Sequence, residues 1–289
     1  MSLVSRKSLV VWGLLQGFGT AVADPAPAGG PTPPSPNPDD GTRPAFRLNA
    51  EIDLPLLAVG AVFALARRTK VQPAFCAPMC DRATLNGLDK LSAGYFSESW
   101  SRSSDYELYG LGAAAAAILM LDEGVINALN DYVVIGEATL GATAVASIMT
   151  LAAGRPRPFL YGDPANPESY KAPLSRRNGG DAALSFLSSH TAEAFAIVTS
   201  LYISEHRLHP RSRRPAYMLG AGLAVASLIG LSRVMAGQHF ITDVIGGGLV
   251  GSSVGVLVAS LHGSPVHVVP VVSETPTERQ GGLAITGSF

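Results

Sequence analysis

Charged residues are scarce in this chain. They account for 15% of its 289 residues, against about 25% in a typical soluble protein, while apolar residues account for 47%. The formal net charge is −1, whereas a nucleic-acid partner would call for a clustered basic face. This composition argues against nucleic-acid binding and predicts a membrane protein, with a very apolar helical domain in solution as the alternative.

Cysteine is almost absent, since Cys76 and Cys80 are the only two in the chain. A structural metal site needs further cysteine or histidine ligands nearby, so we expect no metal at this pair. A disulfide would suit an exported protein, but the spacing alone does not establish one. The sequence therefore leaves this pairing open.

The first part of the chain is typical of an exported protein. Residues 1–23 are predicted to be a secretory signal, because a basic start precedes the apolar stretch 9–18 and the small-residue cleavage site at 21–23. That stretch is shorter than the ~20 residues of a membrane span, although an uncleaved anchor is the alternative. Residues 24–44 are dense in proline and are predicted to be an extended linker.

The rest of the chain consists of long apolar runs without the alternation of half-buried strands. They are rich in small residues, which let helices approach closely in membrane bundles. We predict an all-α fold, a bundle of about five to six apolar helices embedded in the membrane. It comprises an N-terminal helical and loop region at 45–104, a core at 105–262 and a tail at 263–289. The apolar runs are 54–66, 108–121, 132–153, 191–203, 216–231 and 244–261.

The topology of this bundle is only partly determined. The basic loop 205–214 is predicted to be cytoplasmic, which places 154–189 on the outer side. With a cleaved signal, both ends of 54–66 then fall outside. This stretch is therefore either peripheral or re-entrant, or else the signal is retained.

The first motif that suggests chemistry is Gly-Arg-Pro-Arg-Pro at 154–158, directly after an apolar run. Prolines restrict the backbone around Arg155 and Arg157. Guanidinium groups present forked donors that match phosphate oxygens. A basic helix end followed by a turn would look the same, so this motif is weak by itself.

The second motif is Ser-Phe-Leu-Ser-Ser-His at 185–190, ahead of another apolar run. Serines such as Ser188 and Ser189 cap helix starts, and the free N–H groups there favour an anion. His190 at that point is able to transfer a proton near neutral pH. A capped helix with an incidental histidine is the alternative.

The third motif is Ser232-Arg233, five residues, His239, three residues, and Asp243. Residues four apart on a helix share a face, so Asp243 is expected to bond one ring nitrogen of His239 and make the other a better nucleophile. A purely structural Asp–His pair is the alternative. Ionisable groups beside apolar helices are, however, often functional.

These motifs resemble the signature of the type 2 phosphatidic acid phosphatase superfamily, which is related to vanadium haloperoxidases and bacterial acid phosphatases. The third motif matches completely. The second has Leu187 and Ser189 where the family has proline and glycine. In the first, Arg157-Pro158 matches, but Thr150 stands where the family has a phosphate-binding lysine. Arg155 or a basic residue of the outer loop (Lys171, Arg176 or Arg177) is a candidate substitute.

The resemblance implies that His239 attacks phosphorus, that Asp243 orients His239, and that His190 protonates the leaving group. The phosphate oxygens would be held by Arg157, Ser188, Ser189 and Arg233. No metal and no cofactor is expected, because arginines neutralise the phosphate charge.

The expected function is a phosphomonoesterase or diphosphatase acting on a lipid phosphate. The expected place is the inner membrane of a bacterial envelope, with the site facing the periplasm. Alternatives are a soluble periplasmic acid phosphatase, a vanadate-dependent haloperoxidase, and a non-catalytic membrane protein that retains the fold. The sequence indicates no oligomeric state.

Overall fold

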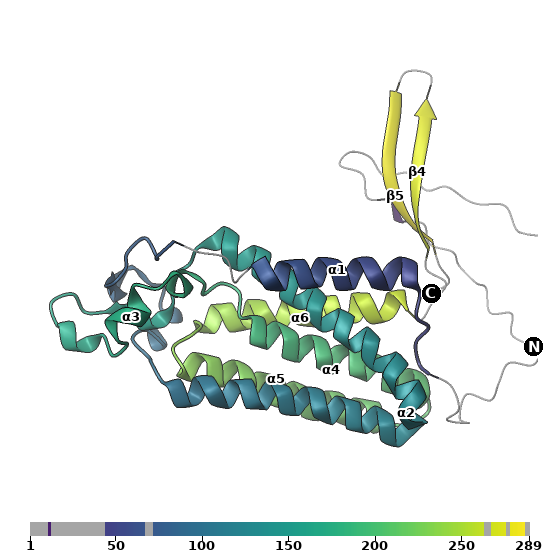
Figure 1. Ribbon diagram of the computed structural model, residues 1–289, viewed down its shortest axis with the longest axis horizontal. Helices are drawn as coiled ribbons and strands as arrows, with labels where there is room; N and C mark the ends of the chain where they lie inside the picture. The colour runs from purple at the N-terminus through teal and green to yellow at the C-terminus, as the bar shows by residue number, and fades with distance from the viewer. Residues whose placement is uncertain (1–10, 13–43, 67–71, 263–266, 276–277, 287–289) are drawn as a thin grey trace, which may run out of the picture.

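A bundle of long helices forms the body of the protein, with loops gathered at one end around the short helix α3 (Figure 1). The computed structural model describes residues 11–12, 44–66, 72–262, 267–275 and 278–286. The predicted all-α bundle is confirmed. Its helices are α1 (Ala50–Ala66), α2 (Glu98–Ala153), α3 (Leu174–Arg177), α4 (Ser189–Leu208), α5 (Arg214–Met235) and α6 (Ile241–Leu261).

The N-terminal predictions fall largely outside these residues. The signal at 1–23 and the linker at 24–44 are described only at 11–12 and 44. Both therefore stay predictions.

Helix α2 bends sharply at Gly124. The backbone there has φ 78° and ψ 164°, a conformation that is accessible to glycine but rarely to other residues. The chain reverses direction, so that the hydroxyl of Tyr132 donates to the carbonyl of Gly112 at 3.3 Å. The apolar runs 108–121 and 132–153 are thus the two arms of α2, and the end of α2 returns to the side from which it began (Figure 1).

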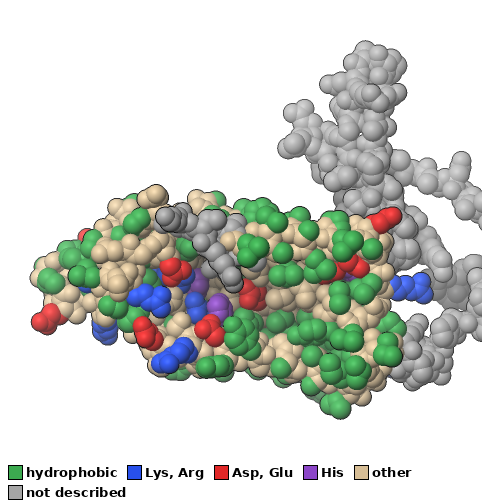
Figure 2. Space-filling model, viewed as in Figure 1, with side chains coloured by type: hydrophobic (Ala, Val, Ile, Leu, Met, Phe, Trp, Pro, Cys, Tyr) green, Lys and Arg blue, Asp and Glu red, His purple; other side chains and the backbone are tan. Residues whose placement is uncertain are grey.

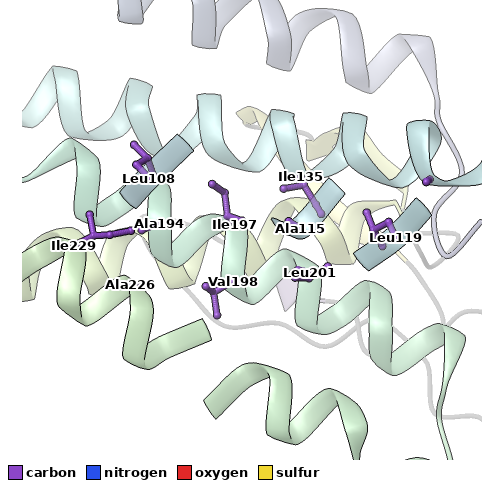
Figure 3. Close-up of a cluster of buried hydrophobic side chains, with 11 residues drawn as sticks. Leu108, Ala115, Leu119, Ile135, Ala194, Ile197, Val198, Leu201, Ala226 and Ile229 are labelled. Carbon is purple, nitrogen blue, oxygen red and sulfur yellow. The ribbon is translucent and has the colours of Figure 1, made fainter. Parts of the chain in front are cut away.

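A cluster of buried aliphatic side chains holds the arms of α2 against α4 and α5 (Figure 3). Leu108 and Leu119 come from the first arm, Ile135 from the second, Ile197 from α4 and Ile229 from α5. Removing such side chains from water is the main favourable contribution to packing in the interior. This cluster fixes the helix ends that carry the site.

Helices α4 and α6 approach very closely because glycine lines their contact. A β-carbon at Gly247 would lie 2.6 Å from the carbonyl oxygen of Ser188, and one at Gly251 would overlap the backbone of Ala192. The expectation from small residues is met here. This contact places the start of α6 directly beside the start of α4.

Among the described residues, three helical segments are long and apolar enough to cross a membrane: Glu98–Leu160, Arg214–Met235 and Ile241–Leu261. Their outer faces carry large apolar side chains, including Leu121 and Leu249, which are 86% and 67% exposed. Figure 2 shows such side chains along the flank of the bundle. In α1 the apolar part is shorter, at Asp53–Phe63, and α1 packs along α2.

The remaining elements are short. Strands β2 (Cys80–Asp81) and β3 (Tyr161–Gly162) pair in parallel, and Cys76 and Cys80 form a disulfide, which answers the question that the sequence left open. The C-terminal tail contributes β4 (His267–Thr275) and β5 (Glu278–Thr286), in a sheet of order β1-β5-β4 with β1 at Val11–Trp12. Single 3-10 turns lie at Arg82–Thr84, Asp89–Leu91, Pro158–Leu160, Pro167–Ser169 and Gly180–Ala183.

Candidate active site

The three sequence motifs meet at the loop-bearing end of the bundle. Arg157 follows the end of α2, the pair Ser188–Ser189 opens α4, and Arg233 lies in the last turn of α5. His239 lies in the turn between α5 and α6. In Figure 2 histidine side chains lie in a recess near this end, with acidic and basic side chains around them.

His239 is almost completely buried, with 1% of its surface exposed. Its Nδ1 lies 2.6 Å from the carbonyl oxygen of Ser185. A carbonyl oxygen only accepts hydrogen bonds, so Nδ1 carries the proton. In the neutral ring the lone pair is therefore on Nε2.

Asp243 does not make the hydrogen bond to His239 that the spacing suggested. Its Oδ2 is 4.0 Å from Nδ1 of His239, because His239 precedes α6 and the carbonyl of Ser185 occupies the position beside the ring. Asp243 instead accepts from Ser185 Oγ at 2.5 Å and from the N–H of Phe240 at 2.9 Å. Its Oδ1 also accepts from Nη1 of Arg155 at 2.5 Å. Asp243 is thus connected to His239 through Ser185.

The surroundings of His239 favour its neutral form. Burial lowers the pKa of this imidazole well below its ordinary value, and the charges of Arg157 and Arg233 lower it further. His190 has the same effect, while the bond to Ser185 opposes it. Both guanidiniums and the second imidazole thus act on the charge state of His239.

His190 has a carboxylate partner that none of the three sequence motifs predicted. Its Nε2 lies 2.7 Å from Oδ1 of Asp105, in the first arm of α2. The same region binds Arg233, whose Nη1 donates to Ser104 Oγ at 3.0 Å and lies 3.9 Å from Asp105. The start of α2 is therefore a wall of the site.

Arg157 is held rigidly. Only 3% of its surface is exposed, and its guanidinium donates to the carbonyl and carboxylate of Asp181 at 2.9 and 2.8 Å. Nη1 also donates to the carbonyl of Gln238 at 3.2 Å and to the side chain of Gln238. Gln238 and Asp181 are thus positioning residues that the sequence did not single out.

The start of α4 turns the positive end of a helix towards the site. Ser188 caps the helix by accepting from the N–H of Thr191 at 3.5 Å, and its own N–H donates to the carbonyl of Asp243 at 3.2 Å. Ser189 is the first helical residue and is buried. A helix start with its positive end at this place suits an anion.

Thr150 does not replace the lysine that the motif lacks. Its hydroxyl donates to the carbonyls of Ala146 at 2.6 Å and Leu187 at 3.3 Å. Arg155 is engaged by Asp89 at 2.6 Å and by Asp243. The guanidinium of Arg155 therefore stabilises the first turn of α6 and is not directed at a phosphate site.

The other candidates to replace the missing lysine are basic residues of the outer loop. Arg177 donates to the carbonyls of Ala172 and Pro78, and Arg176 is exposed on α3. Lys171 lines a cavity of about 640 Å³ together with Arg82 and Lys90. None of the seven candidate site residues lines that cavity.

One glycine allows the tight turn before His239. Gly237 has φ +71°, and a β-carbon there would overlap the carbonyl of Tyr95. Only glycine fits both the dihedral angle and the space. The turn that carries Gln238 and His239 is thereby packed against the segment that leads into α2.

A family model matches the part of the chain that carries this site. The model of the PAP2 superfamily matches residues 131–264, a region that holds all seven candidate residues. This region belongs to the PAP2 superfamily. The resemblance found in the motifs is therefore confirmed.

Two individual proteins are similar to the chain. A "Lipid A 1-phosphatase" of Porphyromonas gingivalis is 43% identical over 85 residues, which are 29% of this chain and 17% of that protein. The chain thus matches only a small part of that relative's length. The crystal structure described as the first transmembrane PAP2 type phosphatidylglycerolphosphate phosphatase, from Bacillus subtilis, is similar with a TM-score of 0.41 and 20% identity, covering 72% of this chain and 94% of that one.

Proposed function

We propose that this protein is a phosphatase that hydrolyses a lipid phosphate through a phosphohistidine on His239. The observation that carries the proposal is the environment of that ring. Its Nδ1 is held by the Ser185 carbonyl, and its pKa is lowered by burial, Arg157 and Arg233. A neutral imidazole with an Nε2 lone pair among cations is a nucleophile for phosphorus.

In the first step Nε2 of His239 attacks phosphorus, and the bond from phosphorus to the leaving oxygen breaks. The leaving oxygen takes a proton from His190, whose ring is held by Asp105. The guanidiniums of Arg157 and Arg233 stabilise the charge on the other phosphoryl oxygens. Ser188 and the N–H of Ser189 at the start of α4 complete this set of donors.

In the second step a water molecule attacks phosphorus, and the bond from phosphorus to Nε2 of His239 breaks. His190 accepts the proton of that water, as microscopic reversibility requires. Inorganic phosphate leaves and the neutral imidazole is restored. Asp243 keeps Ser185 in place throughout, and so keeps the proton of His239 on Nδ1.

The proposed substrate is a lipid whose phosphate reaches this end of the bundle while its chains stay beside apolar helices. The proposed location is a bacterial inner membrane with the site on the periplasmic side, because the basic loop at the opposite end favours the cytoplasm. Candidates are phosphatidic acid, phosphatidylglycerophosphate and undecaprenyl diphosphate. The name of the P. gingivalis relative adds the 1-phosphate of lipid A.

A phosphate-release assay on purified protein in detergent micelles tests the proposal. We expect release from at least one of these four lipids and a much lower rate with a water-soluble phosphomonoester. A soluble-type acid phosphatase would show the reverse preference. Bromide oxidation with vanadate and peroxide, without phosphate release, would instead indicate a haloperoxidase.

A further inference from the structure

Three ligand-type side chains meet in the interior, far from the candidate active site. They are Asp53 from α1, Glu137 from α2 and His262, the residue after α6. One ligand atom of each lies within 4.8 Å of the others. Asp243 and His262 are at opposite ends of α6, a helix of 21 residues that is about 30 Å long. The cluster is thus separate from the phosphatase chemistry.

The cluster holds more acceptors than donors. Nδ1 of His262 lies 2.8 Å from the carbonyl of Val258, so Nδ1 carries a proton and Nε2 faces the two carboxylates. Nε2 is 2.8 Å from Asp53 Oδ1 and 3.1 Å from Glu137 Oε2. A single N–H cannot satisfy both of these carboxylates.

Glu137 makes this shortage acute. Its side chain is 0% exposed, and among the described residues its carboxylate is approached by Nε2 of His262 at 3.1 Å without a well-formed hydrogen bond. Within the same described part of the chain, no lysine or arginine forms an ion pair with Glu137 or Asp53. Buried carboxylates are costly without compensation, and one imidazolium at His262 offsets only one of the two negative charges, so the arrangement favours a further cation.

A second cluster of the same composition shows the contrast. Asp122, Glu205 and His209 also lie close together. There, however, the guanidinium of Arg214 lies 2.6 Å from Asp122 and 3.6 Å from Glu205. That cluster contains an arginine, whereas among the described residues the cluster at His262 has neither arginine nor lysine as an ion-pair partner.

We propose that Asp53, Glu137 and His262 bind a divalent transition-metal ion, of which Zn²⁺ is the prototype. One imidazole and two carboxylates are ligands that Zn²⁺ accepts, with a water molecule as fourth ligand. The bond from Nδ1 to the Val258 carbonyl is the outer contact that orients a metal-bound histidine. The ion joins α1, α2 and the end of α6, so its role is structural.

Zn²⁺ alone is the probe in the test. The full-length protein in detergent micelles is stripped with a chelator, titrated with Zn²⁺ by calorimetry, and analysed for bound metal after desalting. We expect about one ion per chain and a higher Tm with Zn²⁺ than without it. Glu137→Gln and Asp53→Asn should each weaken binding by more than about 100-fold. Asp122→Asn, in the cluster that holds Arg214, should bind like the wild type.

Two results overturn the proposal. One is a wild-type protein that retains no Zn²⁺, and the other is unchanged binding in both Glu137→Gln and Asp53→Asn. If these variants fail to fold, Co²⁺ in the wild-type protein gives a second readout. Visible d–d bands typical of a four-coordinate N/O site are expected, and the spectrum of hydrated Co²⁺ would contradict the site. Phosphate release is not the readout, so failure here leaves the proposed phosphatase activity unaffected.

Discussion

The Nδ1 atom of His239 lies 2.6 Å from the carbonyl oxygen of Ser185, while the hydroxyl of the same serine donates to Asp243 at 2.5 Å. Ser185 therefore links the nucleophile that we propose to the carboxylate that was expected to touch it. The backbone carbonyl fixes the tautomer of the ring, and the carboxylate fixes the serine. Asp243 is accordingly a positioning residue in this account.

The first prediction concerns this link. Asp243→Asn removes the charge that holds Arg155 and Ser185, so we expect kcat to fall by about 10- to 100-fold with KM changed little. Ser185→Ala keeps the backbone carbonyl and loses only the hydroxyl, so its kcat should fall less. Steady-state kinetics on one lipid phosphate decide the matter. An unchanged kcat in Ser185→Ala beside a large loss in Asp243→Asn would contradict the indirect role of Asp243.

The second prediction concerns His190 as the acid. His190→Ala should lower kcat by about 10²- to 10⁴-fold on a lipid phosphate, because the alkoxide leaving group needs a proton. With p-nitrophenyl phosphate the leaving group needs none, and the loss in the first step should be much smaller. Burst-phase measurement of p-nitrophenol release separates this step from hydrolysis of the intermediate. If His190→Ala lowered the rate equally with both leaving groups, His190 would not be the general acid.

Much of this site could be predicted from the sequence, and the exceptions have a common physical cause. The helical runs and the residues His239, His190 and Arg157 follow from local patterns and spacing. The partnership between His190 and Asp105 joins residues 85 positions apart, so it depends on the reversal of α2 at Gly124. No local pattern in the sequence contains that information.

The error about Asp243 is of another kind. The spacing of four residues brings side chains together within one helix, but α6 begins at Ile241 and His239 precedes it. The acceptor that bonds the ring is a main-chain carbonyl, that of Ser185. Every residue has such a carbonyl, so residue type carries no signal for this role.

The third prediction is a pH dependence. Burial, Arg157 and Arg233 lower the pKa of His239. The ring therefore stays neutral and reactive even when the pH falls somewhat below the ordinary histidine pKa of about 6.5. The acid limb of kcat/KM should therefore lie below that pH in the wild type. Arg233→Gln removes one positive charge, which raises the pKa of His239 and moves the limb to higher pH. Arg176→Gln, which alters an exposed arginine of α3, is the matched control and should leave the limb in place. A limb that stays put in Arg233→Gln would contradict the assignment.

The fourth prediction concerns the lysine that the motif lacks. The hydroxyl of Thr150 reaches the carbonyl of Leu187, next to Ser188, so Thr150→Lys introduces a cation beside the phosphate-binding start of α4. A charge-assisted hydrogen bond to phosphate contributes about 1.5–3 kcal/mol, so KM should fall by about tenfold or more. Thr150→Met, of similar length without the charge, is the control. The same KM in both variants would show that another cation already serves the phosphate.

The covalent intermediate on His239 is the central claim, and trapping it is the most direct test. The protein is mixed with a ³²P-labelled lipid phosphate, quenched in alkali within milliseconds, and mapped by peptide mass spectrometry. The account predicts an acid-labile, alkali-stable phosphoramidate on His239 that is absent from a folded His239→Ala variant. Phosphate release by His239→Ala at the wild-type rate, or label found on another residue, would contradict it.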